Sequence, residues 1–88
     1  MIVLSFSLNK DVSATTTDDG MVLLNERDGR YFQLNSTGAY IVEALNNGST
    51  PDEVARQLAA RFAVSLEQAT ADTRALIFAL SDARLVHQ

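Results

Sequence analysis

The apolar residues of this chain change their spacing at about Asn35, and this change limits the fold more than any other feature. Before Asn35 they tend to alternate with polar residues, as Leu4, Phe6 and Leu8 do; after it they recur three and four residues apart. A period of two indicates half-buried strands, whereas a period near 3.6 indicates amphipathic helices. We therefore expect one α+β domain over residues 1–88, with strands first and helices after them.

Four segments before Asn35 fit strands joined by short turns. The predicted strands are Leu4–Leu8, Val12–Thr17, Met21–Glu26 and Arg30–Leu34, and the turns are Asn9–Asp11, Asp18–Gly20 and Arg27–Gly29. Clusters of Asp, Asn and Gly favour turns because their side chains or backbone tolerate tight conformations. If the strands form a meander in chain order, Arg30–Leu34 is a free edge of the sheet.

The register of the last hairpin follows from its apolar residues. A three-residue loop, Arg27–Asp28–Gly29 with Gly29 in the left-handed region, pairs Leu24 with Phe32, whereas a two-residue loop brings fewer apolar residues together. A slip by one residue moves every side chain to the other face of the sheet. We therefore predict the three-residue loop, in which Phe32 and Leu34 face the core and Tyr31 faces away from it.

Three helices are predicted after these strands, each with its own start signal. The first begins at Asn35 or Ser36, and the second at Thr50, where Thr50–Pro51–Asp52–Glu53 forms a capping box. The third begins at Ser65, and Gln68 repeats the capping pattern. The expected core faces are Ala39, Ile41, Val42 and Leu45 in the first helix; Val54, Leu58 and Phe62 in the second; and Leu66, Ala69, Thr73, Leu76, Ile77 and Leu80 in the third.

The composition argues against several classes of function. Seven basic and eleven acidic residues give a net charge of −4, which disfavours nucleic acid as a partner. The absence of cysteine excludes thiol catalysis, disulfides and thiolate metal sites. The one histidine, His87, is too isolated to form a metal or catalytic site, and no phosphate loop or nucleophile motif is present. We expect neither an enzyme nor a bound cofactor.

The apolar start of the chain does not resemble a targeting segment. The segment that begins with Met1–Leu4 has no basic region of the kind found in signal peptides, and its apolar run is interrupted at Ser5 and Ser7. No stretch reaches the roughly 20 apolar residues that span a bilayer. We expect a soluble cytoplasmic protein with no membrane partner.

Two kinds of binding surface remain. A hairpin beside two capped helices is also found in winged helix-turn-helix proteins, whose second capped helix enters the DNA major groove. Here that helix carries Glu67 and Asp72 before its first basic residue, Arg74, so it would repel the phosphate backbone. The residue pattern therefore favours a peptide as the partner over DNA.

A peptide site is predicted between the third helix and the Arg30–Leu34 edge. This strand contains no proline or lysine, so little protects it from pairing with an added strand. Phe78 lies outside the predicted core face of the helix. It either lines a groove for a guest side chain, or is a lone surface aromatic or a dimer contact. Arg74 is likewise either a contact for the guest peptide or a solvated side chain. The predicted peptide-binding residues are Arg30, Tyr31, Phe32, Gln33, Leu34, Ala71, Asp72, Arg74, Ala75 and Phe78.

These segments resemble the PqqD-like family, which includes the recognition elements for ribosomally synthesised, post-translationally modified peptides (RiPPs). The resemblance covers Val12 to Val86 and rests on Asp19–Gly20–Met21–Val22–Leu23–Leu24, Gly29–Arg30–Tyr31–Phe32–Gln33–Leu34–Asn35–Ser36–Thr37–Gly38–Ala39, Asn47–Gly48 and Ala83–Arg84–Leu85–Val86. The family's "aromatic–x–Leu–Asn–x–Thr–Gly" passage, Phe32 to Gly38 here, is its most specific part. Arg84 departs from the family, which often has Gly before the final Leu–Val.

The resemblance implies a winged helix-turn-helix-like fold, with a three-stranded antiparallel sheet followed by three helices. It also implies that the leader of a precursor peptide binds as an added strand beside the third strand and against the third helix. Among family members, the chain looks most like the stand-alone recognition protein of lasso-peptide biosynthesis. The implied partners are then the precursor leader and a leader peptidase. The alternative is a PqqD-like peptide chaperone for another modification enzyme, such as one of the radical-SAM type.

Overall fold

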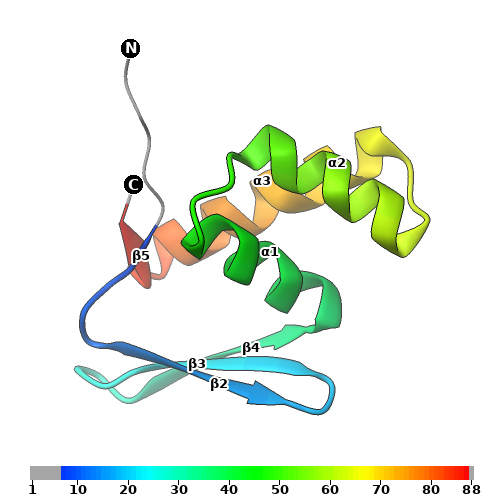
Figure 1. The fold of residues 1–88 in the computed structure, drawn as a ribbon. Coiled ribbons are helices and arrows are strands. Elements are labelled where there is room, and N and C mark those ends of the chain that lie inside the picture. Colours follow the sequence, from blue (N-terminus) through cyan, green and yellow to red (C-terminus); the bar gives the residue numbers. More distant parts are fainter. Residues whose placement is uncertain (1–6, 88) are drawn as a thin grey trace.

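The chain forms a three-stranded sheet and three helices, and Figure 1 shows the helices on one face of the sheet. The computed structural model describes residues 7–87. Its elements are β1 (Ser7–Leu8), β2 (Val12–Thr17), β3 (Gly20–Asn25), β4 (Arg30–Asn35), α1 (Ser36–Asn46), α2 (Pro51–Phe62), α3 (Leu66–Asp82) and β5 (Val86–His87). The sheet is antiparallel with the order β2-β3-β4. The predicted α+β class and the three helices are confirmed, and so is the meander over β2, β3 and β4, whereas β1 lies outside this sheet.

A second, very small sheet joins the two ends of the described chain. Leu8 in β1 pairs with Val86 in β5, and the Asn9 backbone N–H donates to the Leu85 carbonyl at 2.9 Å. The sequence did not predict β5. Arg84, just before it, has a left-handed φ of +60°, a conformation that glycine adopts more easily. This backbone requirement accounts for the glycine often found there in the family. Residues 4–6 of the predicted first strand lie outside the described residues.

The predicted register of the β3–β4 hairpin is wrong by one residue. Leu23 pairs with Phe32, and Met21 pairs with Leu34. Leu23 is fully buried, whereas Leu24, which was expected opposite Phe32, is only half-buried on the other face. The faces of β4 are nevertheless those predicted, because Leu34 is buried and Phe32 packs against the core.

The loop of this hairpin has four residues, 26–29, because side chains at its base stabilise a longer turn. The Asn25 carbonyl accepts from the Gly29 N–H at 2.8 Å, and the Asn25 side-chain oxygen accepts from the Arg27 N–H at 3.0 Å. The Asp28 carboxylate accepts from the Arg30 N–H at 3.0 Å. Gly29 has a φ of +74°, the left-handed conformation predicted for it.

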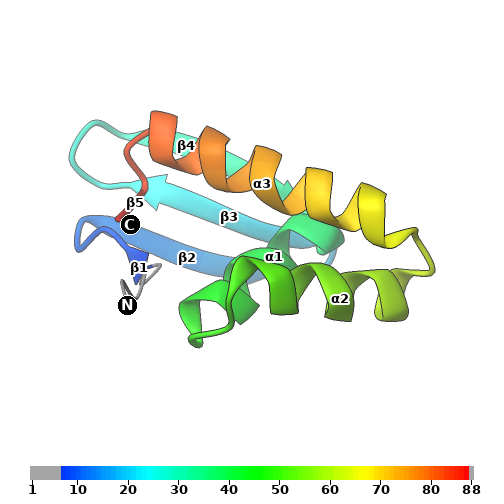
Figure 2. The same cartoon turned by 90° about the horizontal axis from the view of Figure 1, so that it is seen from above.

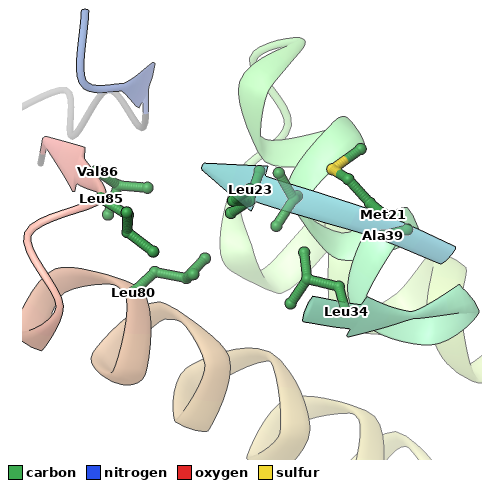
Figure 3. Packing of buried hydrophobic residues seen from close by; sticks show 8 residues of the cluster. Met21, Leu23, Leu34, Ala39, Leu80, Leu85 and Val86 are labelled. Atoms are coloured by element: carbon green, nitrogen blue, oxygen red, sulfur yellow. The ribbon is translucent and has the colours of Figure 1, made fainter. Parts of the chain in front are cut away.

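The core consists of two clusters. One lies between the sheet and the helices and contains Met21, Leu23, Leu34, Ala39, Val42, Leu80, Leu85 and Val86 (Figure 3). The other lies among the helices and contains Ile41, Leu45, Val54, Ala55, Leu58 and Ala69. Leu66 was expected in the core but is 52% exposed. It shares the helical face of Thr73 but is the first residue of α3, where neighbouring elements no longer cover that face.

The predicted helix starts are confirmed, with one difference in α3. The Asn35 side chain caps α1 by accepting from the Gly38 N–H at 2.9 Å, and Thr50 and Glu53 form the capping box of α2. Ser65 caps α3 by accepting from the Gln68 N–H. The Gln68 side chain does not complete a second box, because its amide donates to the Asp72 carboxylate at 2.7 Å.

None of the helices in residues 7–87 is long and apolar enough to cross a membrane. The same residues contain no group of three or more His, Cys, Asp or Glu side chains arranged to hold a metal ion.

Candidate functional site: the groove between β4 and α3

Strand β4 forms one edge of the sheet. Within the described part of the chain it pairs with β3 alone, so its other side carries no strand partner, as predicted. Backbone N–H and C=O groups on an edge strand point alternately toward the neighbouring strand and away from the sheet. The edge of Arg30–Asn35 therefore offers outward donors and acceptors to an extended peptide.

A groove of about 430 Å³ lies between this edge and α3, which runs alongside it in the view from above (Figure 2). It is lined by Phe32, Gln33, Leu34, Asn35, Thr37, Gly38, Ile41, Asp72 and Leu76. Its apolar part comes from residues that also pack on the core, such as Leu34 and Leu76. Its polar part includes Gln33 and Asp72. An apolar floor with a few polar groups suits the alternating side chains of an extended peptide.

Two glycines, Gly20 and Gly38, allow neighbouring segments to pack closely against Leu34 in the wall of this groove. A Cβ on Gly20 would overlap the carbonyl oxygen of Leu34, so only glycine lets β3 approach the end of β4 this closely. A Cβ on Gly38 would lie 3.3 Å from the Cβ and Cδ2 atoms of Leu34. Since Asn35 ends β4 and also caps α1, the strand passes into the helix without a loop. The edge strand is thereby fixed relative to α1.

Asp72 is the one ionisable side chain in the lining of the groove. It is half-buried, and its Oδ1 atom accepts a hydrogen bond from the Gln68 side chain one turn earlier in α3. This bond positions the carboxylate at the rim. A basic side chain or an N–H group of a bound peptide is the natural partner for it.

The predicted site residues do not all meet in this groove. Phe32, Gln33, Leu34 and Asp72 line it. Arg30 lies in a separate polar hollow of about 680 Å³, formed by the β3–β4 loop, the β1–β2 turn and the end of α3. Tyr31 is 76% exposed, and strand alternation directs it to the opposite face of the sheet from Phe32. Ala71 and Ala75 are exposed and line neither hollow.

The expectation that Phe78 and Arg74 lie beside β4 is wrong. Both line another hollow, of about 480 Å³, between the start of α2 and α3. At about 100° per residue, Phe78 is turned about 200° from Leu76 around the helix axis. The core face of α3 has two flanks, and the sequence pattern did not distinguish the flank that faces β4. Five lining residues were not predicted as site residues: Asn35, Thr37, Gly38, Ile41 and Leu76. Leu76 is the missed residue of α3, and its position one turn after Asp72 is the signal for it.

Comparisons with known proteins agree with this geometry. The family model "Coenzyme PQQ synthesis protein D (PqqD)" matches residues 20–86. A search of curated proteins found no match. A chain of the solved structure "Lasso peptide synthetase B1 complexed with the leader peptide" is 38% identical, with a TM-score of 0.89; the match covers 96% of this chain and 99% of that one.

A second solved structure, "TbiB1 in Complex with the TbiA(beta) Leader Peptide", is similar as well. Its chain is 28% identical with a TM-score of 0.83, and the match covers 92% of this chain and 94% of that one. The family model includes the sheet from β3 onward, all three helices and the terminal Leu85–Val86. On this match, and on a fold shared over nearly the whole chain, the protein belongs to the PqqD family.

Proposed function

We propose that this protein binds the leader region of a ribosomally synthesised precursor peptide in lasso-peptide biosynthesis. The observation that carries the proposal is the open edge of β4 beside a groove that has both apolar and polar lining residues. An extended leader segment would add a fourth strand to the sheet next to β4. Every second leader side chain would then enter the groove, while the others would remain in solvent.

The two parts of this site supply different kinds of binding energy. Backbone hydrogen bonds to an edge strand contribute roughly 0.5–1.5 kcal/mol each and depend little on sequence. Burying one apolar leader side chain among residues such as Phe32, Leu34 and Leu76 contributes roughly 1.5–3 kcal/mol. The groove therefore provides the selectivity between leader sequences, and Asp72 adds a preference for a basic or N–H-bearing group.

The similar solved chains support lasso-peptide biosynthesis over other functions of the family. Both are described in complex with a leader peptide, and the first is described as lasso peptide synthetase B1. We propose that the protein does no chemistry itself and presents the bound leader to a leader peptidase. A modification enzyme of another pathway, such as a radical-SAM enzyme, is the alternative partner, suggested by the coenzyme PQQ synthesis description of the family model.

A titration tests the proposed function. The fluorescently labelled leader of a precursor encoded near this gene is titrated with the protein, and anisotropy reports the bound fraction. A labelled DNA duplex serves as the comparison. We expect saturable binding of the leader and none of the duplex at equal concentration. Binding of the duplex without binding of the leader would contradict the proposal.

A further inference from the structure

The width of the groove depends on how the two ends of α3 are held. Asp72 and Leu76 of α3 line the groove together with Phe32 and Leu34 of β4. The hydrogen bonds and ion pairs found within residues 7–87 include none between α3 and β4. Contacts outside the groove must therefore fix the spacing between the helix and the strand.

The beginning and the end of α3 pack on different parts of the molecule. Near its beginning, Ala69 is fully buried in the cluster among the helices, together with Ile41 and Leu58. Near its end, Leu80 is fully buried in the cluster that lies on the sheet. The other helices thus hold the beginning of α3, whereas its end is held by the sheet and by the segment that follows the helix.

The chain reverses direction directly after α3. The Leu85 N–H donates to the Leu80 carbonyl at 2.9 Å, and the Arg84 N–H donates to the Ser81 carbonyl at 3.0 Å. With Arg84 in the left-handed conformation and Leu85 in the same cluster as Leu80, these two bonds form a Schellman motif. The carbonyl groups of Arg84 and Leu85 take no part in the motif and accept hydrogen bonds from another segment.

Asn9, between β1 and β2, donates to both of these carbonyl groups. Its side-chain Nδ2 donates to the Arg84 carbonyl, and its backbone N–H donates to the Leu85 carbonyl at 2.9 Å. The Asn9 carbonyl accepts from the N–H of Val12, the first residue of β2, at 2.9 Å. The Asn9 Oδ1 atom is buried and accepts no hydrogen bond from the described residues, so the side chain acts here through its donor. Asn9 thus connects the end of α3 to the sheet.

We infer that Asn9 is a positioning residue for the groove, which holds α3 at the spacing from β4 that admits a leader side chain. The inference rests on the proposed function. Leu76 lies about two turns before Arg84 in a helix that is continuous to Asp82, so a shift of the helix end moves Leu76 relative to Leu34. The outward backbone groups of β4 would keep their places, because β3 and α1 hold this strand. Loss of the Asn9 side chain should therefore impair selection of the leader side chain more than strand addition.

The test measures how strongly each protein distinguishes two leader peptides. One is the leader encoded near this gene. In the other, alanine replaces the apolar residue whose replacement weakens binding to the wild-type protein most. Anisotropy gives the ratio of the two affinities, and circular dichroism gives the melting temperature of each protein.

Three variants are compared with the wild type. Asn9→Ala removes the side-chain bond, and Asn46→Ala makes the same change at an exposed position of α1. The third is the double variant Asn9→Ala/Arg84→Gly. Glycine adopts the left-handed conformation of Arg84 without strain, so this substitution restores stability but not the bond from Asn9.

We expect the wild-type ratio to be about tenfold or more, as for burial of one apolar side chain, and to fall below about threefold in Asn9→Ala. The melting temperature of Asn9→Ala should fall by several degrees through the lost hydrogen bond. In the double variant the melting temperature should recover while the ratio stays low. Asn46→Ala should keep the wild-type ratio.

An unchanged ratio in Asn9→Ala would overturn the inference. A ratio that recovers with the melting temperature in the double variant would overturn it as well, because Asn9 would then act through stability alone. If Asn9→Ala does not fold, the double variant supplies the comparison. Wild-type binding that no alanine in the leader weakens would refute the positioning role and leave strand addition intact. Failure of the wild-type protein to bind the leader would refute the proposed function itself.

Discussion

Leu34 at the end of β4 packs directly on Gly38 in the first turn of α1, so closely that a Cβ on Gly38 would lie 3.3 Å from two atoms of the leucine side chain. Leu34 belongs to the buried core and also lines the groove. This contact therefore links the position of α1 to the shape of the proposed leader site. It also gives a physical reason for glycine in the Phe32–Gly38 passage that marks the family.

Substitution of Gly38 by alanine should impair binding more than folding. Alanine in a helix is more favourable than glycine by roughly 0.5–1 kcal/mol, which offsets the strain of displacing Leu34. We expect Gly38→Ala to shift the melting temperature by only a few degrees and to weaken leader affinity several-fold. Asn46→Ala, at an exposed position of the same helix, is the control. A Gly38→Ala protein with wild-type affinity would show that the Leu34 wall does not contact the leader.

Charge reversal at the groove should act locally. Asp72→Lys places a cation at the rim of the groove. If the leader offers a basic group there, its binding should weaken by up to about 1 kcal/mol, because an exposed ion pair contributes no more than this. Glu67→Lys makes the same change of charge on α3 at an exposed position outside the groove. The affinity difference between the two variants should shrink as salt rises, since charges are screened beyond about 10 Å at 0.1 M. Equal affinities at low salt would show that Asp72 is not in contact with the leader.

The end of α2 contains a position where glycine should stabilise the fold. Ala63, the C-cap, has a left-handed φ of +55°, in which a Cβ is strained. We expect Ala63→Gly to raise the free energy of unfolding by about 0.5–1 kcal/mol, measured by urea denaturation. Ala60→Gly, in the helix three residues earlier, should lower it by a similar amount. Destabilisation by both substitutions would contradict the observed cap.

The capping box of α2 should make stability depend on acid pH. The Thr50 backbone N–H donates to Glu53 at 2.9 Å and, together with the Thr50 side chain, lowers the pKa of Glu53 below its ordinary value of 4.5. A carboxyl group whose pKa is lowered in the folded state contributes to the free energy of unfolding. This contribution is fully present above the unfolded-state pKa and is lost as pH falls through the folded-state pKa. The melting temperature of the wild type should therefore fall more between about pH 6 and about pH 3 than that of Glu53→Gln. Identical pH profiles would refute the role of the carboxylate.

The sequence predicted the elements well because their signals are local. Caps at Thr50 and Ser65 and the change of period at Asn35 require no knowledge of tertiary contacts. The β3–β4 register could not be predicted in the same way, because four consecutive apolar residues, Met21 to Leu24, supply apolar partners in either register. The choice depended on hydrogen bonds of Asn25 and Asp28 within the loop.

The candidate site was predicted in part for a related reason. The edge strand followed from the order of the strands, and Phe32 and Leu34 followed from their alternation. The residues of α3 that line the groove could not be predicted in this way, since periodicity defines the buried face of α3 but not the flank that meets β4. Phe78 was therefore assigned to the groove although it lies on the other flank. The pairing of β5 with β1 could not be predicted, because two strands of two residues each are too short to show an alternating pattern.

Residue-resolved amide hydrogen exchange of the protein, with and without saturating leader peptide, tests strand addition at β4 most directly. In the free protein, the N–H groups of Tyr31–Asn35 that point away from β3 should exchange quickly, whereas the Arg30 N–H already donates to the Asp28 carboxylate. We predict that these alternate amides become protected on binding, whereas the outward amides of Val12–Thr17, at the opposite edge of the sheet, do not change. A leader that binds without protecting any β4 amide would contradict strand addition.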